Sequence, residues 1–423
     1  MPGVQAAHTS RSRPQLWLVG LVALSLASAS VPLVYLGVRA SAVPFTQILE
    51  ILSRPQVGML VVNTIGLSLS VALSAVIMGT TIAAILSRLQ VGGNRLWLLV
   101  SALPLAVPSY LASYGWLVIS PGLDGFAPSY ALLTAVTVPY VILPVAAALR
   151  GTSADAESVA RTLGLGPIEA FRKVTWPRVR PAAIAGGLLV FLYSLSDFGL
   201  VSMLRFPTLT WGVQQAYASS FDRSQAAILA LLLVVIALVV VSAERSARGL
   251  VTQSSSVPSP LEPISRPVWM VVMLLVSLPP LIGVVVPLVG LGIRLANAQT
   301  LREIDGTRLF VATSMTVGVS LAAAVVALVL ALPIAALAAR YSTRWAGVLE
   351  GLGYLSHGLP GIVVGLSLVF FSLQVVPALY QSVVVLVFAY AVLFMPKALG
   401  TARASIEAVS PDLVSVARTL GSS

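Results

Sequence analysis

Ten apolar runs, each long enough to cross a bilayer, recur along the chain and restrict its fold class. A membrane-spanning helix needs roughly 20 consecutive apolar residues, and helices are the usual way for such runs to satisfy their backbone in lipid. The chain has 58% hydrophobic and 9% charged residues and a mean hydropathy of +0.97, too apolar for a soluble domain of 423 residues. We therefore expect an all-α polytopic membrane protein. The expected helices cover about residues 16–37, 60–87, 96–120, 128–149, 182–203, 225–243, 268–293, 310–339, 347–373 and 382–401.

The formal net charge of +11 is compatible with nucleic-acid binding or with orientation in a membrane. Orientation is favoured because the basic residues stand at the ends of the apolar runs. If the N-terminus is cytoplasmic and every run crosses once, 18 of the 25 Lys and Arg residues face the inside. Arg11 and Arg13 precede the first run, which reads better as an uncleaved helix than as a signal peptide because more spans follow. The sequence thus predicts a multi-pass protein of the cell inner membrane with a cytoplasmic N-terminus.

An internal duplication divides the chain. The word ESVARTLG at 157–164 returns as VSVARTLG at 414–421. At a constant offset of 252 residues, four earlier positions also match, namely Gly66, Arg88, Pro108 and Pro144 with Gly318, Arg340, Pro360 and Pro396. Both copies run in the same direction, so they are parallel repeats. We expect a first repeat at 1–243, a Ser- and Pro-rich cytoplasmic linker at 244–267 and a second repeat at 268–423.

The two copies have unequal lengths. The first continues for about 79 residues past Gly164, whereas the second stops two residues past Gly421. The first copy has six expected spans and the second has four. A full second copy would bring the chain to about 500 residues, so we expect a fragment or a truncated reading frame. The alternative is a naturally asymmetric protein with ten spans.

Residues 150–181 form the longest polar stretch between two spans and predict two short helices. Residues 155–163 favour the first helix, Gly164 and Gly166 break it, and Pro167 is well placed to begin the second. The apolar side chains of the two helices are Val159, Leu163, Ile168 and Phe171. The basic side chains of the stretch are Arg161, Arg172, Lys173, Arg178 and Arg180. An apolar tip ringed by positive charge suits docking into a groove on another protein. It equally suits an amphipathic helix lying on lipid.

This stretch resembles a known protein family. Its residues Glu157, Ala160, Gly164, Phe171, Pro177 and Pro181 resemble the EAA loop of binding-protein-dependent ABC importer permeases. Ser158 and Val159 replace the usual Ala, and Trp176 stands where Leu often precedes the Pro, but the Glu, Gly and Pro spacing is intact. The resemblance implies a coupling helix, including Arg161, that enters a cleft of an ATP-hydrolysing subunit. In the second copy it points to Ala417, Arg418 and Gly421.

Other segments are similar to the fused, double-length permeases of the iron(III) subfamily. They are LPLAVPSYLASYGWL at 103–117, LSDFGLVSML at 195–204 and LPGIVVGLSLVFF at 359–371. The resemblance implies two parallel six-helix bundles of the type I ABC importer permease, the second incomplete here. It also implies ferric iron as cargo, delivered by an extracytoplasmic binding protein, and a homodimer of ABC ATPase subunits. Double-length permeases for thiamine look similar, so thiamine or another small solute is the alternative cargo.

Candidates for the translocation pathway are Pro108, Tyr110, Asp197 and Pro360. Asp197 is the best acid within a span, and such acids usually face a cavity or a partner. The alternative for Asp197 is a helix-end acid near the headgroups or a hydrogen bond that packs two helices.

The sequence predicts no chemistry performed by the chain itself. It has no GxxxxGK[ST] phosphate loop, no Cys and only two His, so we expect no catalytic set, no metal site and no bound cofactor. ATP and Mg²⁺ would belong to the partner ATPase subunits. An ion-gradient-driven transporter is a rival, but it predicts ionisable pairs at mid-membrane, and this chain offers almost none. A non-transporting membrane scaffold is the third possibility.

Overall fold

The structure is a computed structural model and describes residues 15–150, 154–218, 223–248, 261–297, 305–341, 344–354 and 361–407. The chain divides into two compact units. The larger unit is Val43–Glu303, and the smaller unit combines Met1–Ala42 with Ile304–Ser423. Helices dominate both units, as the apolar runs predict.

The larger unit begins with helices that build its core. They are α2 (Phe45–Ser53), α3 (Pro55–Arg88), α4 (Asn94–Ala102), the 3-10 helix η1 (Leu103–Ala106), α5 (Ser109–Ile119), α6 (Phe126–Thr137) and α7 (Pro139–Arg150). Next come α8 (Ala154–Thr162), α9 (Pro167–Ala170), the π-helical turn η2 (Phe171–Thr175), α10 (Trp176–Ser196), α11 (Gly199–Met203), α12 (Leu209–Ala218) and α13 (Arg223–Arg248). The last are α14 (Arg266–Pro280), the π-helical turn η3 (Leu281–Val285) and α15 (Val286–Ala296).

The core of the larger unit lies where α3, α7 and α10 pack on one another. Small residues allow these helices to approach closely. A Cβ on Gly79 of α3 would lie 2.7 Å from the Cβ of Val141, and one on Gly186 of α10 would lie 2.7 Å from the carbonyl oxygen of Tyr140. Small residues at helix contacts are typical of membrane proteins, because apolar lipid offers helices little hydrophobic reason to associate.

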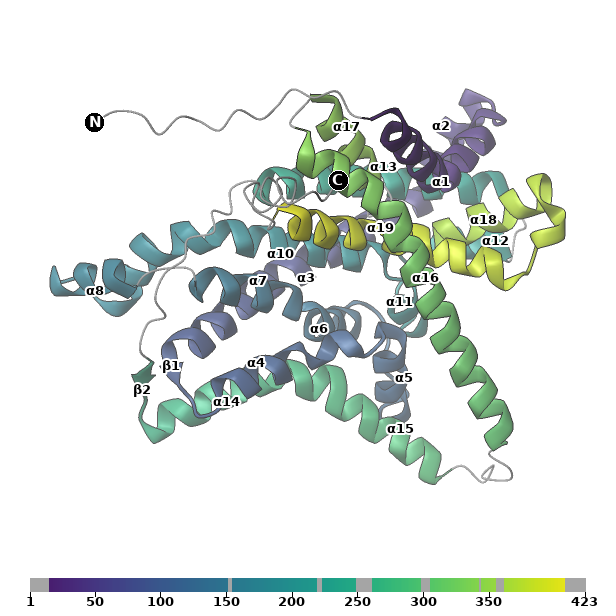
Figure 1. Cartoon of the computed structure of the whole chain (residues 1–423). Coiled ribbons are helices and arrows are strands. Elements are labelled where there is room, and N and C mark those ends of the chain that lie inside the picture. The colour runs from purple at the N-terminus through teal and green to yellow at the C-terminus, as the bar shows by residue number, and fades with distance from the viewer. Residues whose placement is uncertain are drawn as a thin grey trace, which may run out of the picture. The chain divides into compact units, whose positions relative to one another are not determined.

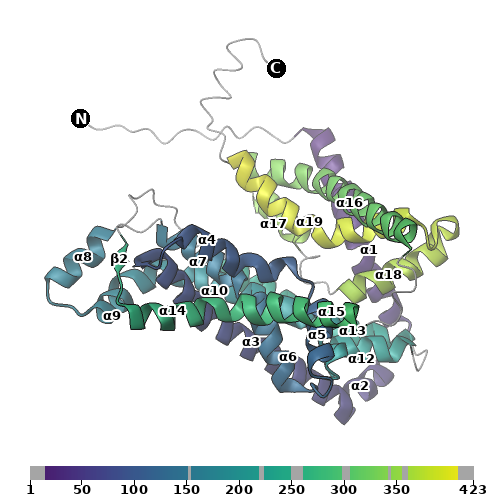
Figure 2. The same ribbon diagram turned by 90° about the horizontal axis from the view of Figure 1, so that it is seen from below.

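The long helical rod α14–η3–α15 packs along this core. Figures 1 and 2 both show it as one extended element. Its first part lies against α4 and α6, and its last part lies against α5. Val272, Met273 and Val276 of α14 are buried in the core of the unit. The rod therefore belongs to the larger unit, although it opens the second sequence repeat.

The smaller unit contains α1 (Leu16–Ser41), α16 (Gly306–Arg340), α17 (Arg344–Gly353), α18 (Gly361–Val375), the 3-10 helix η5 (Pro377–Leu379) and α19 (Val383–Glu407). Its core joins Leu18, Val22 and Leu26 of α1 to Ile334 of α16 and Leu399 of α19. Asp305 begins α16 by accepting hydrogen bonds from the backbone nitrogens of Thr307 and Arg308.

The two compact units divide the chain differently from the two sequence repeats. The smaller unit contains the first apolar helix of the first repeat, and the larger unit contains that of the second repeat. The repeats at 1–243 and 268–423 rest on matching sequence, which this division does not test, so they stay a prediction. The expected linker at 244–267 also stays a prediction; α13 continues into its first residues, to Arg248. Near the end of that range, β2 (Glu262–Pro263) pairs in parallel with β1 (Leu89–Gln90).

Eight helices or continuous helical rods in the described residues are long and apolar enough to cross a membrane. Three of the ten expected spans differ from the prediction. The span at 182–203 is shifted, because α10 begins at Trp176 and ends at Ser196, and α11 follows it. The span at 96–120 is broken into a bent pair of helical segments at 89°. The span at 347–373 consists of α17 and α18, with residues 355–360 between them outside the described chain.

The bend has a local cause. Pro104 and Pro108 cannot donate a backbone hydrogen bond, and a residue that precedes proline avoids the helical region. Val107, just before Pro108, is extended, with φ −98° and ψ 118°. A new helix, α5, begins directly after Pro108. Hydropathy alone does not reveal such a break, because both segments are apolar.

Candidate functional site

The polar stretch after α7 folds as an elbow, which we define as residues 154–175. It comprises α8, a turn, α9 and the π-helical turn η2, which leads directly into α10. Figure 1 shows α8 at one end of the larger unit, beyond the ends of α7 and α10. The sequence prediction is correct for the first short helix and for the start of the second at Pro167, but the second helix continues without a break into α10.

Gly164 makes the turn of the elbow. Its φ is +92°, a conformation that other L-residues rarely adopt. The Gly164 nitrogen donates to the Arg161 carbonyl oxygen at 3.0 Å, and the Leu165 nitrogen donates to that of Ala160 at 3.2 Å. These bonds satisfy carbonyls at the end of α8, as glycine-dependent helix ends commonly do.

Glu157 ties the elbow to the helical core. Its Oε2 lies 3.0 Å from Nη2 of Arg88, the last residue of α3, and both side chains are only 18% exposed. The same oxygen accepts a hydrogen bond from the Thr175 hydroxyl at 2.7 Å. One carboxylate therefore joins α8, the C-terminal end of α3 and the segment that begins α10.

Sequence reasoning selected Glu157 but missed both of its partners. Arg88 carried a signal, because it recurs as Arg340 at the corresponding place of the second repeat. Thr175 carried none, since its role depends on how η2 folds back toward α8.

The elbow has a buried and an exposed side. Ala160 is buried, and Phe171 packs against the main core. By contrast, Val159 is 55% exposed and Leu163 is 79% exposed. This apolar pair at the tip has basic neighbours, since Arg161, Arg172 and Lys173 are all exposed.

One acid lies within this basic rim. The Lys173 ammonium lies 2.7 Å from Glu169 Oε1. Its hydrogen bond and charge, with a smaller contribution from Arg172, lower the pKa of Glu169. The contact with Lys173 therefore favours the charged form of this exposed carboxylate.

The prolines of the predicted motif lie in α10. Pro177 occupies its first turn, where a missing N–H does no harm, and Pro181 is buried inside the helix. Trp176, the first residue of α10, packs against the main core. The elbow is thus continuous with a core helix.

The second elbow lies outside the described residues, and with it Ala417, Arg418 and Gly421. The sequence still shows one chemical difference. Val414 stands where the first copy has Glu157, so the second copy lacks the carboxylate that pairs with Arg88. Arg340, the counterpart of Arg88, is exposed at the end of α16.

Three of the four pathway candidates meet in the larger unit. Pro108 precedes α5, Tyr110 lies in its first turn, and Asp197 follows α10. The Ser109 hydroxyl donates to Asp197 Oδ2 at 2.5 Å. A Cβ on Gly199 would lie 2.7 Å from the Cβ of Tyr110, so α11 lies directly against α5. Pro360 falls outside the described residues.

The buried Asp197 carboxylate supports local structure. Its Oδ1 accepts hydrogen bonds from the backbone nitrogens of Leu200 at 2.9 Å and Val201 at 3.4 Å. Together with the Ser109 bond, this geometry is that of a helix-end acid that also packs two helices. Whether Asp197 also lines a pathway is not tested by these contacts, and that role stays a prediction.

The fold and the elbow together define a class of protein. It is a polytopic helical membrane protein whose helix bundle carries a polar helical elbow with two exposed apolar side chains at its tip. Comparison with known proteins specifies the class. Residues 75–248 match the family described as "Binding-protein-dependent transport system inner membrane component". The Fe(3+)-transport system permease protein FbpB 2 of Haemophilus influenzae is 30% identical over 426 residues, covering 97% of this chain and 82% of the relative. The chain therefore belongs to this permease family.

Other relatives match a smaller part of the chain. The molybdenum transport system permease protein ModB of Mycobacterium tuberculosis is 30% identical over 233 residues, covering 50% of this chain and 86% of the relative. The putrescine transport system permease protein PotI of Escherichia coli is 29% identical over 163 residues, covering 35% of this chain and 58% of the relative.

Membership in the family confirms the main sequence prediction. The chain is a multi-pass inner-membrane permease of an ABC importer. A secondary transporter and a non-transporting scaffold are thereby set aside. Dependence on a binding protein, which the family description states, implies an ABC ATPase and a substrate-binding protein as partners.

Proposed function

We propose that this permease carries ferric iron, delivered by an extracytoplasmic binding protein. The supporting observation is the similarity to an Fe(3+)-transport permease along 97% of the chain. The molybdenum and putrescine relatives match half of the chain or less. Thiamine or another small solute is the alternative cargo.

We propose further that the elbow transmits ATP-driven motion. The chain itself binds no cofactor, and ATP and Mg²⁺ bind to two copies of one ATPase subunit on the cytoplasmic side, where the N-terminus also lies. The exposed Val159 and Leu163 enter a groove of that subunit. The ion pair of Glu157 with Arg88 and the continuity of η2 with α10 support a direct mechanical path to two core helices. Closure of the ATPase dimer would then shift the bundle between inward and outward access.

A reconstituted transporter tests the cargo. The permease, expressed from its complete reading frame, is placed in liposomes with its binding protein and its ATPase, and uptake of radiolabelled ferric iron is measured with and without ATP and Mg²⁺. We expect ATP-dependent iron uptake and none of thiamine. Uptake of thiamine without iron would assign the alternative cargo, whereas iron uptake unaffected by ATP would contradict the coupling scheme.

Cysteine crosslinking tests the ATPase contact separately from the cargo, because the native chain has no Cys. Thr162→Cys in the exposed end of α8 and Thr419→Cys in the second copy should both capture the same ATPase surface. Leu49→Cys, an exposed position on the predicted outer side, is the control. If neither threonine position captures the ATPase while the transporter is intact, the elbow lies on lipid instead.

A further inference from the structure

A cavity of about 300 Å³ lies beside the inner ends of α3 and α7. Its size is at the lower end for small-molecule sites, roughly 300–1,000 Å³. Its described lining residues are Leu86, Ser87, Arg88, Asn94, Arg95, Leu98, Leu149, Arg150 and Leu261. The elbow function uses Arg88 but leaves this cavity unexplained.

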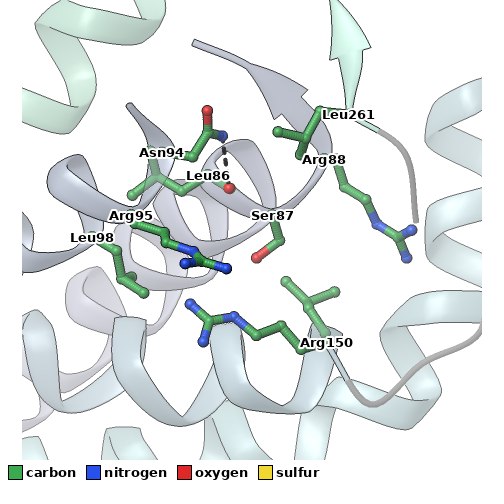
Figure 3. Close-up of a pocket in the computed structure, with 9 residues that line it drawn as sticks. Leu86, Ser87, Arg88, Asn94, Arg95, Leu98, Arg150 and Leu261 are labelled. Carbon is green, nitrogen blue, oxygen red and sulfur yellow. Dashed lines mark hydrogen bonds between the residues drawn. The ribbon is translucent and has the colours of Figure 1, made fainter. Parts of the chain in front are cut away.

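The charge of the lining points to an anionic ligand. Three of the described lining residues are arginines and none is acidic. Arg88 pairs with Glu157, so the proposal rests on Arg95 and Arg150. Figure 3 shows the Arg95 and Arg150 side chains extending toward one another, with the Ser87 hydroxyl beside them. An anion in the cavity would be attracted by both guanidinium groups. Arginine binds phosphate well because its planar fork can donate two parallel hydrogen bonds.

The wall that carries Arg95 is fixed before any ligand arrives. The Asn94 side chain donates to the carbonyl oxygens of Leu86 at 2.9 Å and Leu89 at 2.7 Å. Its Oδ1 accepts a hydrogen bond from the Val91 nitrogen at 3.3 Å. These bonds hold the turn between α3 and α4, so Arg95 starts from a defined position in the first turn of α4. The positive end of the α4 dipole adds to the attraction for an anion.

The position of the cavity indicates where the anion comes from. The spans Pro55–Arg88 and Phe126–Arg150 both end at it, which places it at the boundary of the bilayer. Its leucines supply apolar walls next to the arginines, as a site for a lipid headgroup and the first part of its chains requires. Membrane orientation accounts for basic residues at span ends. It does not account for their convergence on one cavity.

We propose that this cavity binds a phosphate group, and specifically that of an anionic phospholipid of the inner leaflet. Free phosphate shares the same chemistry and is the alternative source. The test uses the full-length chain in detergent micelles, with native mass spectrometry to count bound phosphatidylglycerol or phosphatidylcholine. The wild type should retain one phosphatidylglycerol in preference to phosphatidylcholine. Arg95→Gln with Arg150→Gln should retain phosphatidylglycerol about tenfold more weakly or worse.

A matched double variant, Arg180→Gln with Arg266→Gln, removes the same charge from exposed positions outside the cavity lining and should behave as the wild type. If millimolar inorganic phosphate displaces the bound phosphatidylglycerol, the site is assigned to free phosphate. If the phosphatidylglycerol stays bound, the site is assigned to the lipid. If the cavity variant unfolds on heating earlier than the control, Arg95→Gln alone is measured at a temperature where it is folded. Equal retention by the cavity variants and the wild type, or no preference for the anionic lipid, would overturn the proposal.

Discussion

At the residue scale, the carboxylate of Glu157 shows how a motif residue acquires its role. A mostly buried carboxylate needs a partner to offset its lost hydration. Arg88 supplies the opposite charge and Thr175 supplies a hydrogen bond. The second repeat has Val414 at this position, so it cannot form the same ion pair.

Glu157→Gln removes the charge and nearly preserves the shape. We expect it to destabilise the elbow by about 2 kcal/mol, because the mostly buried Arg88 loses the charge-assisted contact with the Glu157 carboxylate. ATP-driven uptake should fall while membrane insertion is retained. Thermal unfolding in detergent and uptake in liposomes measure the two effects. Glu169→Gln is the control, since its pair with Lys173 is exposed and should matter little.

Gly164→Ala tests the left-handed turn of the elbow. A residue with a Cβ is destabilised by roughly 1–2 kcal/mol in the left-handed region of φ and ψ. The turn should therefore open, and the coupling of ATP hydrolysis to uptake should weaken. Gly166→Ala is the matched control for Gly164→Ala, because both glycines have open space for a Cβ and only Gly164 has a positive φ. Uptake per ATP hydrolysed is measured for both variants. Equal values for the two would show that the φ of Gly164 is irrelevant to coupling.

At the element scale, the contact between α5 and α15 depends on close backbone approach. A Cβ on Gly115 would overlap backbone atoms of Pro287, and one on Gly290 would overlap the backbone of Gly115. This contact, together with α14, holds the first apolar rod of the second repeat within the larger unit. The Trp116 indole adds a hydrogen bond at 2.8 Å to the carbonyl oxygen of Ile282 in η3.

Gly290→Ala should therefore push α15 away from α5. Overpacking of this kind costs about 1–3 kcal/mol, because backbone atoms cannot turn aside as a side chain can. Thermal unfolding and limited proteolysis within α15 measure the loss. Gly292→Ala, two residues along the same helix, has no neighbour near its added Cβ and should be silent. Unchanged stability in Gly290→Ala would refute the close contact.

At the scale of the whole molecule, the orientation of the chain decides what the elbow can reach. The basic residues predict that the elbow lies inside and that α2, between the first two spans, lies outside. Family membership fixes the multi-pass inner-membrane character but leaves this orientation as a prediction. Because the chain has no Cys, introduced thiols report orientation without background.

Leu163→Cys and Leu49→Cys together test the predicted orientation of the chain in the membrane. Both side chains are exposed, at 79% and 52%, so neither is shielded by the fold. A membrane-impermeant maleimide should label Leu49→Cys in cells whose inner membrane is intact, and Leu163→Cys only after that membrane is opened. The reverse pattern would place the elbow outside and exclude contact with a cytoplasmic ATPase.

The sequence by itself determined the all-α membrane class, most of the spans and the helix–turn–helix form of the elbow. These features depend on local composition and spacing, such as an apolar run of bilayer length or a glycine between two short helices. The resemblance to the permease family also came from short sequence motifs, because the spacing of Glu157, Gly164 and Pro177 is intact within one loop. The bend before Pro108 was missed because hydropathy measures apolar content and not direction.

Only the tertiary structure decided which side chains meet. Ser109 and Asp197 are 88 residues apart in the chain, yet they share a hydrogen bond across α5 and α10. The pairing of Glu157 with Arg88, the convergence of Arg95 and Arg150 on one cavity and the packing of α15 on α5 are likewise contacts between distant segments. Their partners depend on how helices pack, and packing is set by side-chain shape at every interface at once. A pattern read along one segment carries no information about which neighbour that segment will have.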